Sequence, residues 1–201
     1  SVTQCYLNLV DALIGRQTLL LIFPYNFDVD ALFSQDQQAS MMIVYGNYND
    51  TWVRDYGGLS VFKYGEMHLL DFKFNGWGGK FKWELDNKQT AFLFQQSVFE
   101  DQVIRQDKLD FVLEGGSIET NGEGLLLVTE SCLLNPNRNP ALSHIEIEKE
   151  LKETFSVKEV LWLKQGKMMG DDTDGHVDTL VRFVSKDTLV YVKCTDPQDV
   201  H

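Results

Sequence analysis

The sequence predicts an α/β fold built from small mixed units rather than a doubly wound parallel sheet. Short apolar stretches typical of strands alternate with single helical segments along the chain. Residues 59–64 and 67–72 flank the two-residue loop Gly65-Glu66, which is typical of an antiparallel hairpin. No low-complexity linker interrupts the 201 residues, a length that commonly forms one domain with a sizeable core. We therefore expect a single domain over residues 1–201.

The first half of the chain predicts two buried strands on either side of a helix. Residues 18–23 and 41–45 are continuous apolar runs, as expected for strands in a core. Between them, Asp28 stands near the start of a segment that favours a helix over residues 28–38. Residues 89–99 have the spacing of a partly amphipathic helix.

The second half predicts one helix and several strands. Ser143 and Glu146 have the spacing of a capping box, which would open a helix that continues through Phe155. Strands are expected where apolar, β-branched and aromatic residues cluster, at residues 124–129, 159–163, 179–184 and 188–192.

The composition excludes several classes of partner. The chain carries 30 Asp and Glu against 18 Lys and Arg, and the resulting net charge of -12 would repel nucleic acid and anionic lipid. The same charge would attract a cationic small molecule, although many acidic surfaces serve only solubility. No apolar run approaches the roughly 18 residues that span a bilayer, and the start lacks the pattern of a signal peptide. We expect neither a nucleic-acid nor a membrane partner.

The cysteines predict neither a disulfide framework nor a CxxC metal site. Cys5, Cys132 and Cys194 are odd in number and have no close spacing, which fits a reducing cytoplasm. We interpret Cys132 as structural, and we place Cys194 in an apolar strand, where a buried thiol behaves as a small hydrophobic side chain.

Three segments are too polar and too rich in glycine to be explained by packing alone. The first, residues 49–58, follows a predicted strand and brings Trp52, Arg54 and Asp55 to its end, where scaffolds present chemistry. Taken alone, a surface pair of Arg54 and Asp55 with Trp52 in the core is the better explanation. In the second segment, Glu114 precedes two glycines that would let the backbone approach a ligand closely.

The third segment, residues 170–178, is the densest in ionisable groups. If it is extended, Asp174, His176 and Asp178 project to one side, with Asp172 on the same row. Such a group would suit a metal, but the calcium-loop spacing fails and the HExxH zinc motif is absent. It would also suit a planar cation held by paired carboxylates, with a histidine beside an acid for proton transfer. We favour the cation over the metal.

Together these segments resemble the agmatine deiminase and bacterial peptidyl-arginine deiminase family. The resemblance rests on five stretches that occur in the family's order, namely NDTWVRDYGG (49–58), DFKFNGWGGK (71–80), LEGGSIETNGEG (113–124), TESCLLNPNRNP (129–140) and GDDTDGHVDTLVRF (170–183). It implies a single catalytic domain with a five-bladed α/β propeller of ββαβ-type units, of which this chain would hold only part. The agmatine deiminase branch is the most similar.

The resemblance also implies a site and a mechanism. Asp55 and Asp178 would hold the guanidinium of a small cationic guanidino substrate, and Glu114 and His176 would be the acid-base pair. Trp52 would line the pocket, and Asp172 would lie near the tail of the substrate. A cysteine would attack the guanidinium carbon and form a thiouronium intermediate, with neither a metal nor an organic cofactor.

The nucleophile of the family lies in a block beyond the last of these stretches, so we expect this chain to lack it and the family's N-terminal opening. The expected function is agmatine deimination in putrescine biosynthesis, in a cytoplasmic enzyme of a size that often forms a homodimer. Alternatives are a peptidyl-arginine deiminase, a non-catalytic binding protein of the same fold and, last, a metal-dependent hydrolase.

Overall fold

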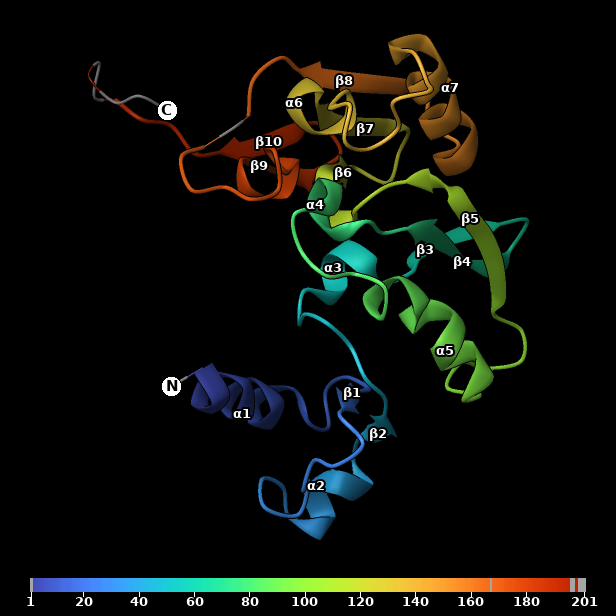
Figure 1. The fold of residues 1–201 in the computed structure, drawn as a ribbon, viewed down its shortest axis with the longest axis vertical. Coiled ribbons are helices and arrows are strands. Elements are labelled where there is room, and N and C mark those ends of the chain that lie inside the picture. Colours follow the sequence, from blue (N-terminus) through green and yellow to red (C-terminus); the bar gives the residue numbers. More distant parts are fainter. Residues whose placement is uncertain (1, 167, 196–197, 199–201) are drawn as a thin grey trace.

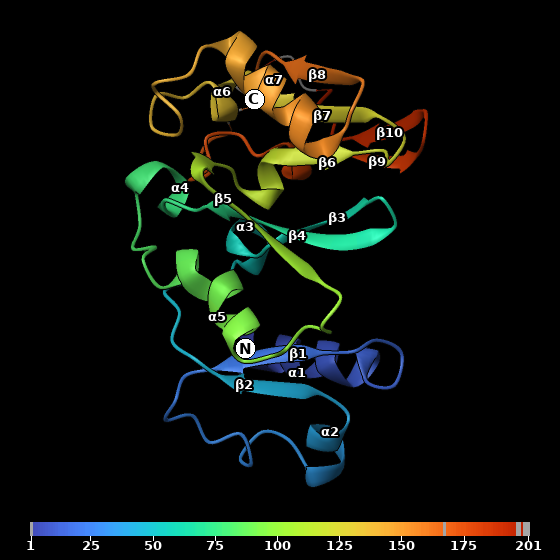
Figure 2. The same ribbon diagram turned by 90° about the vertical axis from the view of Figure 1, so that its right-hand side faces the viewer.

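The computed structural model describes residues 2–166, 168–195 and 198. The expectations about the family's N-terminal opening and its nucleophile concern segments outside these residues. Figure 2 shows three small sheets stacked along the long axis of the molecule, with a further hairpin beside the last of them. The arrangement confirms a mixed α/β fold.

Two complete units follow one pattern, which is an antiparallel hairpin, one or more helices, and a third strand parallel to the second. In the first unit, β3 (Leu59–Lys63) pairs with β4 (Glu66–Lys73), and β4 pairs in parallel with β5 (Ile104–Val112). The connection between β4 and β5 holds α4 (Gly76–Gly79), a 3-10 turn (Asp86–Lys88) and α5 (Gln89–Gln95).

The second unit repeats this order. Here β6 (Ile118–Thr120) pairs with β7 (Leu125–Thr129), which pairs in parallel with β8 (Glu159–Leu163). The connection between β7 and β8 contains α6 (Glu130–Leu133) and α7 (His144–Phe155). The two units share the order and pairing of their elements, and no repeat is visible in their amino-acid sequences.

Partial units lie on either side of these two. At the N-terminal end, α1 (Val2–Leu13) precedes β1 (Leu20–Phe23), α2 (Gln35–Ala39) and β2 (Met42–Tyr45), and β1 and β2 pair in parallel. A short helix, α3 (Val53–Tyr56), leads into the first unit. At the other end, β9 (Val181–Ser185) and β10 (Thr188–Tyr191) form an antiparallel hairpin (Figure 1).

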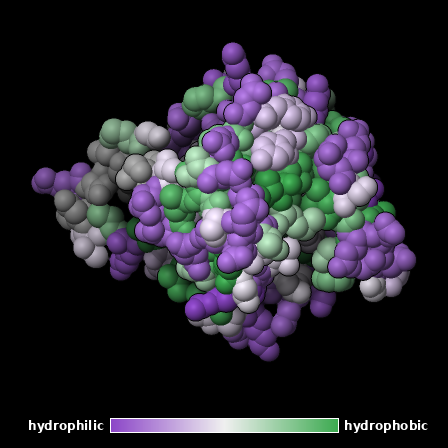
Figure 3. Space-filling model, turned by 90° about the horizontal axis from the view of Figure 1, so that it is seen from below, coloured by the Kyte–Doolittle hydropathy of each residue, from purple (hydrophilic) through white to green (hydrophobic). Residues whose placement is uncertain are grey.

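The largest core lies between the two complete units. Leu70 and Phe72 of β4 pack with Leu126 and Val128 of β7, all of them buried. The apolar face of α7 covers the same core through Ile147 and Leu151, and burial of each such side chain contributes about 1.5–3 kcal/mol relative to exposure. The N-terminal elements have a smaller core around Val10, Val29 and Phe33. Figure 3 views that end and shows hydrophobic and hydrophilic side chains interspersed on it.

Several predicted elements are confirmed with changed limits. The capping box of Ser143 and Glu146 is present and opens α7. The hairpin forms, but its two loop residues are Tyr64 and Gly65 rather than Gly65 and Glu66, since Lys63 pairs with Glu66. Both loop residues have positive φ, as the tightest hairpin turns require.

Other predictions are wrong. The helix predicted over residues 28–38 is confined to α2, because the side chain of Ser34 caps that helix together with Gln37, and Asp28 does not. The strand predicted at 179–184 begins at Val181, after a 3-10 turn over Val177–Thr179. Cys194 lies beyond β10 and is exposed, not inside a strand. Helix α1 and strand β5 were not predicted. In β5, charged residues obscure the alternation of apolar and polar side chains that is typical of a strand.

Among the residues that the structure describes, no helix combines the length and the apolar character needed to cross a membrane.

Candidate functional site

The ionisable groups of the predicted site converge at the carboxyl ends of the parallel strands. Asp55 comes from the connection after β2, Glu114 follows β5, and His176 and Asp178 come from the connection after β8. These strands belong to three different sheets, and contacts of α3 and the Val177–Thr179 turn with the Gly115–Ser117 turn bring the residues after them together. The shared unit pattern therefore brings together side chains that are far apart in the sequence.

Asp55 is buried and held by two donors. The indole Nε1 of Trp77 donates to its Oδ2 at 2.9 Å, and the backbone N–H of Gly116 donates to its Oδ1 at 3.0 Å. Burial raises the pKa of Asp55 above its ordinary value, while both hydrogen bonds act in the opposite direction. The predicted surface pair of Arg54 with Asp55 is therefore wrong for Asp55, whose carboxylate points inward.

Gly116 lies at the centre of the group. A Cβ at this position would lie 2.5 Å from His176 Nδ1, 2.7 Å from Asp55 Oδ1 and 2.9 Å from Asp178 Oδ2. Only a residue without a side chain lets the three groups approach so closely. The glycine pair after Glu114 thus serves this close approach, as the sequence suggests, and Asp55, His176 and Asp178 lie around one point.

Glu114 is fully buried and is paired with a buried arginine. Arg138 Nε donates to Glu114 Oε1 at 2.7 Å, and both side chains have no exposed surface. Burial raises the pKa of Glu114 to about 7, against the lowering effect of the Arg138 charge. Its other oxygen, Oε2, is buried and has no hydrogen-bond partner among the described residues.

His176 is buried and predominantly neutral near neutral pH. Burial lowers its pKa to about 4, although the charge of Asp178 acts to raise it. Its Nδ1 lies 3.5 Å from Asp55 Oδ1, which is long for a hydrogen bond. Its Nε2 is buried and, like Glu114 Oε2, has no hydrogen-bond partner in the described part of the chain. The pKa of Asp178 is raised by burial, with His176 acting against the shift.

The row predicted for residues 172–178 is wrong, because the segment is not extended. Asp174 has φ 67° and Gly175 has φ 95°, and a 3-10 turn follows over Val177–Thr179. With these turns, the carboxylate of Asp174 meets Arg138, which donates to Asp174 Oδ2 at 2.9 Å. Lys80 Nζ lies 2.8 Å from Asp174 Oδ1.

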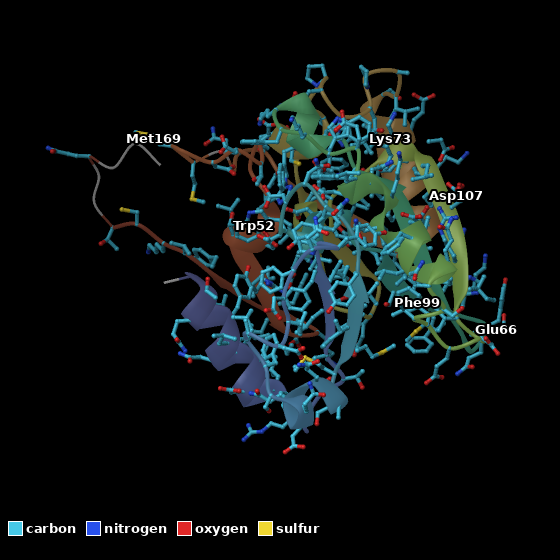
Figure 4. All side chains as sticks on the ribbon, turned by 60° about the horizontal axis from the view of Figure 1, so that its bottom comes forward. Trp52, Glu66, Lys73, Phe99, Asp107 and Met169 are labelled. Carbon is cyan, nitrogen blue, oxygen red and sulfur yellow. The ribbon has the colours of Figure 1, made fainter. Side chains whose placement is uncertain are left out.

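Two predicted substrate-binding residues lie at the surface. The side chain of Trp52 is 64% exposed, so it is not a core residue. Figure 4 shows Trp52 well apart from Lys73 and Asp107, which mark the β4–β5 pair. Asp172 is exposed, and its backbone carbonyl accepts a hydrogen bond from Lys80 Nζ at 2.7 Å. Their roles toward a substrate stay predictions.

Cys132 lies closer to the site than the sequence suggests. Ligand atoms of Glu114, Cys132 and His176 lie within 4.8 Å of one another, and all three residues are buried. These residue types can bind zinc. Burial and the neighbouring charge of Glu114 raise the pKa of the Cys132 thiol well above its ordinary value, so this cysteine does not have the thiolate character of a nucleophile.

Sequence reasoning missed Trp77, Lys80 and Arg138. The first two stand in the FNGWGGK stretch and the third in the NPNRNP stretch, which were noted only for their resemblance. Both stretches contain a signal that could have identified these residues, because glycine or asparagine residues flank a large or charged side chain in each. Which carboxylate each would meet depends on how the units stack.

The fold and the site define an α/β protein with a buried cluster of carboxylates and one neutral histidine at the carboxyl edge of its parallel strands. Such a cluster suits a planar, cationic ligand with several N–H donors. The family profile for Porphyromonas-type peptidyl-arginine deiminases matches residues 1–201, and the chain belongs to that family.

Relatives and solved structures agree with this placement. An agmatine deiminase of Pseudomonas aeruginosa is 39% identical over 167 residues, which cover 80% of this chain and 44% of that protein. The structure of a cysteine-to-serine variant of agmatine deiminase from C. jejuni with substrate bound is 40% identical, with a TM-score of 0.89, and covers 100% of this chain and 58% of that one.

An agmatine deiminase of Enterococcus faecalis, solved while catalysing its reaction, has a TM-score of 0.85 at 30% identity and covers 98% of this chain and 54% of that one. The chain thus spans about half the length of the curated relatives that it matches, between 42% and 54% of three of them.

Proposed function

We propose that the complete protein is an agmatine deiminase, which hydrolyses agmatine to N-carbamoylputrescine and ammonia for putrescine biosynthesis, and that this chain supplies most of its guanidinium site. One observation carries the proposal. Glu114 Oε2 and His176 Nε2 are buried without partners among the described residues, in a cluster that also holds Asp55 and Asp178. A guanidinium offers N–H donors in one plane, and these would satisfy buried acceptors whose desolvation is otherwise costly.

In the proposed reaction, Asp55 and Asp178 hold the guanidinium, and a cysteine elsewhere in the complete protein attacks its carbon. The neutral imidazole of His176 takes the thiol proton as the C–S bond forms, and it then gives that proton to the departing nitrogen. The C–N bond breaks and ammonia leaves. Water hydrolyses the remaining thiouronium, which releases the ureido product and restores the thiol.

The electrostatics of the described residues support these roles. With a pKa of about 4, His176 is neutral near neutral pH, which is the form that takes the thiol proton in this scheme. With a pKa of about 7, Glu114 is poised between its two protonation states, as an acid-base group requires. Neither role needs a cofactor. The repeated ββαβ units and the partial units beside them support the further proposal of a five-bladed propeller in the complete protein.

Peptidyl-arginine deimination is the second candidate, because the family profile carries that name. The two activities share the guanidinium and differ in what accepts the tail of the substrate. An amine tail favours acids such as Asp172, whereas a peptide needs an open cleft. A cytoplasmic location and a homodimer remain predictions from the sequence.

The deciding experiment measures ammonia release by the protein of the complete gene from agmatine, free arginine and a blocked arginyl peptide, with the 201-residue chain as control. We expect turnover of agmatine by the complete protein only. Preference for the peptide would replace the proposal with the second candidate. If none of the three compounds released ammonia, the protein would be a binding protein. Activity that is lost with a chelator would indicate a metal-dependent hydrolase.

A further inference from the structure

Arg138 is a buried cation that connects two parts of the site. It follows α6 in the connection between β7 and β8, and its side chain has no exposed surface. Nε donates to Glu114 Oε1 at 2.7 Å, and Nη1 donates to Asp174 Oδ2 at 2.9 Å. Nη2 donates to the carbonyl of Thr173 at 3.1 Å. The guanidinium of Arg138 thus contacts both Glu114, which follows β5, and the loop that precedes His176.

These contacts restrict the orientation of the Glu114 carboxylate. Arg138 occupies Oε1, and Oε2 is the oxygen left without a partner among the described residues. A carboxylate oxygen of Glu114 lies within 4.8 Å of a ring nitrogen of His176. Since one oxygen is fixed by a short, charge-assisted bond, rotation of the carboxylate would break that bond. The direction of the free oxygen is therefore fixed by the ion pair with Arg138.

The surroundings of Arg138 leave it little freedom to move. Asn137 Oδ1 accepts a hydrogen bond from Nη1 at 2.6 Å. A Cβ at Gly78 would lie 2.5 Å from Nη1 and 2.2 Å from Asn137 Nδ2, so this glycine leaves the space that both side chains fill. Lysine could supply the charge but not the planar fork that reaches Glu114 and Asp174 together.

We propose that Arg138 is a positioning residue, which aims Glu114 Oε2 at the substrate and ties the orientation of Glu114 to the loop that carries His176. The inference rests on the proposed function, because it assigns Arg138 a role in presenting the acid-base pair. Arg138 itself contacts no substrate in this role. It acts through Glu114 and Asp174.

The charge of Arg138 also bears on the protonation of Glu114. The ionisable groups that face Glu114 are Arg138, Asp55, Cys132, His176 and Asp174. Among them, Arg138 acts to lower the pKa of Glu114 and Asp55 acts to raise it. Loss of the cation would therefore raise the pKa of Glu114, so that its carboxylate form would be lost at higher pH.

The test compares Arg138→Lys and Arg138→Gln in the protein of the complete gene, with agmatine as substrate and kcat and KM measured across pH. Arg182→Lys is the matched control, since Arg182 Nε also lies 3.0 Å from a buried carboxylate, that of Glu119.

For Arg138→Lys we expect a fall in kcat of roughly 10²-fold, as misplacement of a reacting group commonly causes, with KM changed much less. The acid limb of its pH profile should stay near that of the wild type because the charge remains. For Arg138→Gln the acid limb should move to higher pH. The Arg182→Lys control should keep kcat within about threefold of the wild type, as expected for a more exposed ion pair.

A kcat of Arg138→Lys equal to the wild type, per folded molecule, would overturn the inference, even if its melting temperature fell. If the wild type releases no ammonia, the proposed function fails, and ¹³C NMR titration of the Glu114 carboxyl then decides. A pKa raised in Arg138→Gln would support the link between Arg138 and Glu114, and an unchanged pKa would overturn it. Because Arg138→Lys keeps the charge, it is the variant to rely on if Arg138→Gln does not fold.

Discussion

Asp55 and Glu114 occupy equivalent places before the two complete units, yet they are held by different chemistry. Each follows a strand that ends the preceding unit, and each accepts a hydrogen bond from a side chain in the helical connection of the next unit. Asp55 accepts from the neutral indole of Trp77, whereas Glu114 accepts from the guanidinium of Arg138.

This difference shows how one backbone pattern places two carboxylates in different environments. Asp55 is also bonded to the N–H of Gly116, so each of its oxygens accepts one hydrogen bond from the protein and keeps a further acceptor site. Glu114 keeps Oε2 without a partner among the described residues, and its pKa of about 7 suits proton transfer. A neutral donor fixes the Asp55 carboxylate, and a charged donor favours ionisation of the more deeply buried Glu114.

The largest effect should come from Glu114→Gln, which keeps the shape but removes the titrating group. We expect kcat for agmatine in the complete protein to fall by roughly 10²- to 10⁴-fold, the usual contribution of a general acid or base. Glu119→Gln is the control, because Glu119 is also buried and paired with an arginine. Equal losses in both variants would mean that buried charge, rather than proton transfer, explains the result.

A smaller effect is expected for Trp77→Phe, which removes the indole N–H from Asp55 and keeps an aromatic ring. The lost hydrogen bond to a charged group is worth about 1.5–3 kcal/mol, so kcat/KM should fall roughly ten- to a hundredfold. Trp83→Phe is the control, since Trp83 packs in the same aromatic cluster. If steady-state kinetics gave the same values for both variants, the role of the Trp77 donor would be refuted.

The smallest expected effect is the pH dependence of the free energy of unfolding that arises from Glu114 and His176. Glu114 has a pKa of about 7 in the folded protein against an ordinary 4.5, so its ionisation lowers the free energy of unfolding as pH rises through that range. For His176 the folded value is about 4 against an ordinary 6.5, so stability rises with pH over that range as the need to bury a charged imidazole disappears.

The two effects oppose each other, and single variants should separate them. Relative to the wild type, Glu114→Gln should gain stability as pH rises between about 4.5 and 7, because it lacks the contribution of Glu114. His176→Gln should lose stability relative to the wild type as pH rises between about 4 and 6.5, because it lacks the contribution of His176. Urea unfolding of both variants across this range provides the measurement, and parallel curves would contradict the two assignments.

The sequence predicted the elements whose signals are local. The capping box at Ser143 opens α7, and the hairpin of β3 and β4 forms as its turn residues require. Local signals failed where a competing one was stronger. Ser34 rather than Asp28 begins α2, and the positive φ of Asp174 and Gly175 breaks the extended row assumed for residues 172–178.

By itself the sequence determined the α/β class, the family, and the identity of the ionisable residues Asp55, Glu114, His176 and Asp178, since these depend on composition, motifs and their order. Only the tertiary structure decided that Trp77 holds Asp55, that Arg138 holds Glu114, and that Asp174 pairs with Arg138. These contacts join residues 22 to 36 positions apart, and stacking of the units, which no local pattern records, brings them within hydrogen-bonding distance.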